Sequence, residues 1–157
     1  MSEQMTALSI HTTAQPRTWV LQADRQAVAS LRISHAATTS GQLRTIEGVW
    51  PIARDRRRWW EITAGDHEDP IVKLGRESAT IKGQAGSIPW EIRGRFSRVH
   101  VILGAYQRTI VLDAAGWRAP TAELQITGTW EHRDLVVLTC FFALIARRRR
   151  SIILLSG

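Results

Sequence analysis

A chain of 157 residues with 44% hydrophobic and 22% charged side chains has the size and composition of one globular domain with a sizeable core. Apolar residues recur along nearly its whole length, which excludes extensive disorder. The formal net charge of +7 is carried almost wholly by arginine. Such a charge favours an anionic partner such as phospholipid headgroups or nucleic acid, or it serves only to keep the protein in solution.

Short strand patterns separated by turn residues occupy the first half of the chain. Residues 1–16 are expected to form a loose N-terminal segment or a first strand. Within 27–33, Leu31 and Ile33 alternate with Arg32, as expected of a strand that is buried on one side. The predicted strands in this half are 17–23, 27–33, 49–53, 59–63, 71–74 and 78–82.

The second half continues in the same way. Pro89 has no amide hydrogen for a sheet ladder, so its strand is expected at an edge or with a bulge. Residues 113–116 form a turn pattern in which Gly116 can adopt a positive φ. The predicted strands are 87–93, 99–103, 108–112, 117–119 and 122–126. Strands at such regular spacing indicate a mainly β fold, either a sandwich or a barrel.

Residues 135–146 are apolar on every face, which predicts a helix that must be surrounded. Its 12 residues would span about 18 Å, whereas the hydrocarbon core of a bilayer is about 30 Å thick. Extension through 147–150 would place four arginines in the bilayer, each at a cost of roughly 2.5 kcal/mol or more. We therefore predict a buried core helix, with Asp134 capping its start and complementing its dipole. Residues 151–155 are an apolar tail, either a last strand or an exposed segment.

The lone cysteine and the first residues limit which covalent links, metal sites and cellular location we expect. Cys140 is the only cysteine, so the sequence allows no intrachain disulfide and no cysteine-based zinc site. It lies in the apolar run and is expected to pack as a small hydrophobic side chain. Residues 1–5 lack a basic region followed by an apolar segment, so we expect no secretory signal and a cytoplasmic location.

A meander of strands that ends in an apolar helix resembles the tubby C-terminal-like superfamily, which includes LURP-one-related proteins and phospholipid scramblases. The resemblance covers about 17–150 and rests on the hairpin rhythm, the turn at 113–116 and the helix at 134–150. It implies a closed antiparallel barrel of about 12 strands around a C-terminal helix at about 134–147, in a single domain of 1–157 with a tail at 151–157. Known members bind phosphoinositides or act at membranes, and some have been linked to transcription.

Arginine-rich segments supply the candidate binding residues. Guanidinium groups pair with phosphate, while tryptophan sits at a membrane interface or stacks on bases. Each cluster also has a purely structural explanation. The arginines beside Trp59 can belong to a solvated hairpin turn with one indole packed inward, and 147–150 can be a helix end that stays in water. Arg93, Arg95 and Arg98 extend the basic patch formed by 54–58 only if the fold brings their loop close to it. The candidates for binding an anion or lipid are Arg54, Arg56, Arg57, Arg58, Trp59, Arg93, Arg95, Arg98, Arg147, Arg148, Arg149 and Arg150.

The sequence contains no recognisable catalytic motif and no phosphate-binding glycine loop. Residues 66–69 carry metal-ligand types, but their contiguity and the following Pro70 favour a turn over a calcium loop, so no metal or cofactor is expected. We predict a non-enzymatic domain, cytoplasmic or peripheral at a membrane, that binds anionic phospholipid or a protein partner through arginine-rich loops. The alternatives are a nucleic-acid-binding barrel, and a small-molecule carrier or enzyme that uses the barrel mouth. A helix that fills the lumen disfavours the last alternative.

Overall fold

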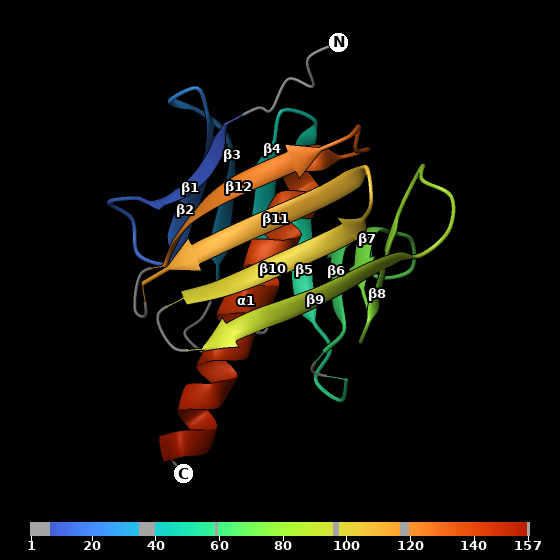
Figure 1. The fold of residues 1–157 in the computed structure, drawn as a ribbon. Coiled ribbons are helices and arrows are strands. Elements are labelled where there is room, and N and C mark those ends of the chain that lie inside the picture. Colours follow the sequence, from blue (N-terminus) through green and yellow to red (C-terminus); the bar gives the residue numbers. More distant parts are fainter. Residues whose placement is uncertain (1–6, 35–39, 59, 96–97, 117–119, 157) are drawn as a thin grey trace.

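A computed structural model describes residues 7–34, 40–58, 60–95, 98–116 and 120–156, apart from the side chains of Arg95 and of 148–156. Within these residues, twelve antiparallel strands close into a barrel in chain order, and a long helix, α1, runs through it (Figure 1). The expected mainly β barrel around a buried C-terminal helix is therefore confirmed. The elements are β1 Leu8–Thr12, β2 Thr18–Ala23, β3 Gln26–Ile33, β4 Ser40–Thr45, β5 Gly48–Arg54, β6 Ile62–Gly65, β7 Pro70–Leu74, β8 Ser78–Ile81, β9 Ile88–Arg95, β10 Arg98–Ala105, β11 Arg108–Ala115, β12 Thr121–Thr127 and α1 Arg133–Ser156.

Most strands lie where alternation predicted them, and the exceptions have physical reasons. The first strand expected as one alternative for 1–16 is β1, which pairs with β12 and closes the barrel. β4 was not predicted, because Leu43 is the buried residue in an otherwise polar segment. The predicted strand 59–63 begins too early: the Asp55 and Glu61 backbones bond across a turn, so β6 starts at Ile62. The predicted strand 117–119 lies outside the described residues.

Pro89 belongs to β9, which has a neighbouring strand on each side in the closed barrel, so the prediction of an edge strand is wrong. It faces Ser78 at the end of a ladder that joins β8 and β9 through only two residue pairs. The next backbone N–H, that of Trp90, donates to the Glu77 carbonyl at 3.1 Å. Neighbouring residues of a strand direct their N–H groups to opposite sides, so the missing Pro89 donor would face β10. The β9–β10 ladder stops at the Trp90–Leu103 pair, and a proline is therefore tolerated one residue beyond it.

The barrel gives the apolar segment of α1 a dry interior. Every side chain from Leu135 to Ala146 is buried, and the Phe141 ring meets Trp19 of β2 edge to face at 5.7 Å between centroids. Thr139, a buried polar residue, donates its hydroxyl to the Leu135 carbonyl one turn earlier. No helix in the described part of the chain is long and apolar enough to cross a membrane.

Both ends of α1 differ from the expectation. The helix begins at Arg133, and the Val136 N–H donates to the His132 carbonyl, so Asp134 lies in the first turn and does not cap it. Its carboxylate is still placed to complement the helix dipole. At the other end the backbone stays helical to Ser156, so a last strand at 151–155 is wrong. Because β1 and β12 already close the barrel, no sheet edge remains for another strand in the described barrel.

The two ends of the barrel are distinct, because connections between antiparallel strands alternate between them. The β1–β2, β5–β6, β7–β8 and β9–β10 connections lie at one end, which we call the exit end because α1 emerges there. The β2–β3, β4–β5, β6–β7, β8–β9 and β10–β11 connections lie at the opposite end, where α1 starts. Figure 1 shows the last turns of α1 projecting beyond the strands at the exit end.

Candidate functional site

Charge is segregated between the two ends of the barrel. Among the described residues, the exit-end connections and the point where α1 leaves carry mostly arginine, with three carboxylates: Arg17, Arg56, Arg57, Arg58, Arg76 and Arg147 against Asp55, Glu61 and Glu77. The connections at the opposite end are mostly acidic: Asp24, Glu47, Asp66, Glu68, Asp69 and Glu131 against Arg25 and Lys82. This distribution gives the barrel a basic end and an acidic end, and a single-sign end attracts ions of the other sign.

Hydrogen bonds from the Asp55 side chain and between backbone groups hold the described residues of the β5–β6 turn. The Asp55 carboxylate accepts the N–H groups of Arg57 and Arg58, each at 2.8 Å. These bonds, that of Arg58 foremost, hold the pKa of Asp55 below its ordinary value. The Glu61 N–H donates to the Arg58 carbonyl at 2.7 Å and closes the turn. The side chains of Arg56, Arg57 and Arg58 are exposed on this turn.

Three contacts join separate elements at the exit end. The Arg76 guanidinium lies 5.4 Å from the centre of the Trp60 ring, which is half-buried. The Trp90 indole N–H donates to the Gly75 carbonyl at 2.9 Å and joins β9 to the β7–β8 turn. Arg147 donates a guanidinium N–H to the Ile92 carbonyl at 3.2 Å, which ties α1 to β9.

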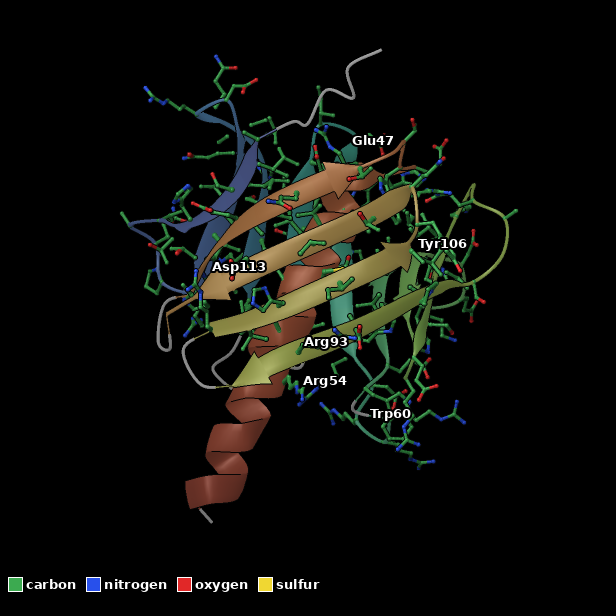
Figure 2. All side chains as sticks on the ribbon, in the orientation of Figure 1. Glu47, Arg54, Trp60, Arg93, Tyr106 and Asp113 are labelled. Atoms are coloured by element: carbon green, nitrogen blue, oxygen red, sulfur yellow. The ribbon has the colours of Figure 1, made fainter. Side chains whose placement is uncertain are left out.

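A cleft of about 260 Å³ lies among these groups. Figure 2 shows Trp60 and Arg54 at the lower end of the barrel, on the side where α1 leaves. The lining consists of two indoles, aliphatic side chains, two arginines and one carboxylate: Trp60, Ile62, Arg76, Trp90, Glu91, Ile92, Ala143, Ala146 and Arg147.

The predicted anion-binding residues are thus brought together in part. Arg54, Arg56, Arg57, Arg58 and Arg147 gather at the exit end, where the helical backbone continues through Arg148, Arg149 and Arg150. Trp59, together with the side chains of Arg95 and of these three arginines, lies outside the described residues.

Arg93 and Arg98 belong to strands that border the exit end, but each is engaged on the outer wall. Arg93 pairs with Glu91 at 2.7 Å, and Arg98 lies 3.8 Å from the Asp113 carboxylate. Both pairs are substantially exposed, so each contributes at most about 1 kcal/mol. These arginines therefore surround the basic end without being directed into the cleft, and Figure 2 shows Arg93 on the β9 wall.

Trp60, Arg76 and Trp90 were not among the predicted binding residues. Arg76 looked like an ordinary turn residue, and Trp90 like one position in an alternating strand. The one sequence feature that could have pointed to these residues is the number of tryptophans, seven in the chain, several of them next to arginine or turn residues. Trp60, Arg76 and Trp90 come together only because the strands close into a barrel.

Metal ligation finds no support in the geometry at the other end. The Asp66 carboxylate accepts the Glu68 N–H at 3.2 Å within the turn, and Asp69 pairs with Lys82. Among the described residues there is no group of three or more histidine, cysteine or carboxylate side chains close enough to hold a metal ion.

Fold and site together define a class: a closed antiparallel barrel threaded by its own C-terminal helix, with one basic end. Comparison with protein-family models, with curated proteins and with solved structures found no match to this chain. The resemblance to the tubby-like superfamily therefore remains a prediction made from the sequence.

Proposed function

We propose that the protein is a non-enzymatic barrel domain that docks with its exit end on anionic phospholipid at a membrane surface. The observation that carries the proposal is the convergence of the β5–β6 arginines, Arg76 and the emerging end of α1 at one end of the barrel. A basic end opposite an acidic one orients the molecule in the field of a negatively charged membrane.

The residue types at this end suit the interface of a bilayer. Arginine pairs bidentately with phosphate, and tryptophan is enriched at the level of the headgroups. Trp60 lies beside the exposed Arg56, Arg57 and Arg58, so docking by the arginines would bring its half-buried indole close to the headgroups. The β5–β6 turn is already ordered by Asp55, so little loop entropy is lost when the arginines bind.

Co-sedimentation with phosphatidylcholine vesicles, with and without phosphatidylserine, tests the proposal. Each arginine near a charged surface contributes up to about 1 kcal/mol. The triple variant Arg56→Gln, Arg57→Gln, Arg58→Gln should therefore lose up to about 3 kcal/mol, or roughly a hundredfold in partitioning. The substitution keeps the backbone bonds to Asp55. Among the described residues it breaks one ion pair, between Arg58 and Glu61 at 3.7 Å, and Lys73 still pairs with the Glu61 carboxylate at 3.2 Å.

A matched control removes the same charge from the opposite end with Arg25→Gln, Arg44→Gln and Lys82→Gln. All three side chains are exposed, and this variant should bind vesicles nearly as well as the unaltered protein. Raising the salt from 0.1 M to 1 M shortens the screening length from about 10 Å to about 3 Å and should release the protein. Equal loss of binding in both triple variants would contradict a directed basic end. Salt-sensitive binding to RNA without binding to vesicles would favour the nucleic-acid alternative.

A further inference from the structure

The cleft at the exit end exists because the barrel wall is short at this point. β6 and β8 have four residues each, and the β8–β9 ladder consists of two residue pairs. Behind the gap, α1 presents Ala143 and Ala146, two small side chains one turn apart that line the cleft. Larger side chains at these two positions would occupy the space that the short wall leaves.

The lining has two chemically different parts. Ile62, Ala143 and Ala146 are buried and apolar, and the indoles of Trp60 and Trp90 add to this surface. The rim carries the exposed guanidinium groups of Arg76 and Arg147, as well as Glu91. Arg93 pairs with the Glu91 carboxylate at 2.7 Å, so that negative charge is largely offset.

We infer that the cleft binds a single acyl chain that carries an anionic head. The chain lies on Ala143 and Ala146 between the two indoles, and the carboxylate or phosphate pairs with Arg76 and Arg147 at the rim. The inference rests on the proposed function, since an exit end held against a membrane meets this ligand at high local concentration.

Size decides how much of a lipid can enter. The volume of about 260 Å³ falls just below the roughly 300 Å³ at which pockets for small molecules begin. A whole phospholipid with two chains does not fit, whereas part of one chain does. Burial of only part of one chain removes little apolar surface from water, so weak and reversible binding is expected.

Titration calorimetry with monomeric decanoate tests this inference without a membrane. We expect saturable binding of decanoate, weaker binding of decanol because the head is neutral, and weakest binding of decyltrimethylammonium. A charge-assisted hydrogen bond contributes about 1.5–3 kcal/mol, so Arg76→Gln should lower the affinity for decanoate about tenfold or more and leave decanol unchanged. The matched control Arg25→Gln, at the opposite end, should change neither.

A second variant, Ala146→Leu, places a larger side chain in the cleft and should abolish binding of both decanoate and decanol. Its control is Ala105→Leu, an exposed alanine at the opposite end. Unchanged decanoate binding in folded Ala146→Leu protein would overturn the inference. If this variant does not fold, the comparison of decanoate with decanol in Arg76→Gln decides, because Arg76 is exposed.

Vesicle binding separates this inference from the proposed function. If decanoate does not bind a protein that still co-sediments with anionic vesicles, the acyl-chain inference is wrong and the proposed membrane docking stands. If decanoate binds, Ala146→Leu blocks that binding and no vesicle binding occurs, the proposed membrane docking is wrong and the cleft binds free amphiphiles. Vesicle binding that Ala146→Leu weakens identifies the chain as one that belongs to a bilayer lipid.

Discussion

Replacement of Phe141 by alanine tests whether the helix is sealed inside the barrel. Among the described residues, Phe141 is one of the two largest fully buried side chains, with 0% of its surface exposed, and its ring packs edge to face against Trp19. Truncation of a buried phenylalanine costs about 3–5 kcal/mol, through lost transfer free energy and the cavity left behind. The edge-to-face contact accounts for about 0.5–1.5 kcal/mol of that loss. Since a domain is stable by about 5–15 kcal/mol, Phe141→Ala should remain folded but weakened.

Urea unfolding followed by circular dichroism measures this loss. With a slope near 2 kcal/mol per molar urea, a loss of about 4 kcal/mol moves the midpoint down by about 2 M. Phe141→Leu keeps most of the volume and should lose about half as much or less. A loss below about 1 kcal/mol for Phe141→Ala, at an unchanged slope, would mean that the ring is not enclosed and would refute the reasoning.

Three further predictions concern single residues. Gly104→Ala should destabilise the protein in urea by more than Gly86→Ala: both glycines have positive φ, but a Cβ at Gly104 would lie 2.2 Å from the Arg108 carbonyl oxygen, whereas one at Gly86 meets nothing within 4 Å. Burial raises the pKa of Cys140 to about 12, so thiol reagents near pH 8 should label it only after unfolding, and fast labelling of folded protein would contradict this. The lowered pKa of Asp55 means that its charge favours the folded state at pH above the ordinary value of 3.8, a contribution lost as the pH falls through the folded pKa. Stability of the unaltered protein should therefore fall more steeply in acid than that of Asp55→Asn, and identical pH profiles would argue against it.

Local pattern predicted the parts of the fold in which burial follows the sequence. β3, at Gln26–Ile33, coincides closely with the predicted strand 27–33, because a strand with one buried side alternates whatever its partners are. The helix was predictable for the same reason, since a segment apolar on all faces must be enclosed. β4 was not predicted from the sequence, because its polar residues adopt strand geometry through pairing with β3 and β5.

The candidate site was predictable only as a set of residue types. The arginines at 54–58 and 147–150 were visible in the sequence, but nothing local says that they share one end. Arg98 lies near Asp113 because of the cross-strand register that pairs β10 with β11, which no local pattern shows. The cleft was not predictable at all, because Trp60, Arg76, Trp90 and Ala146 come from four separate elements or turns.

The sequence by itself determined the strand periodicity, the enclosed helix and an excess of arginine. The tertiary structure decided where that charge lies and what it surrounds. Pairing of β1 with β12 closes the ring, alternation of chain direction assigns each turn to one end, and the path of α1 selects the end from which the helix emerges. These are long-range relations between segments, whereas alternation and helical periodicity are properties of a few neighbouring residues, and this difference explains why the fold was easier to predict than the site.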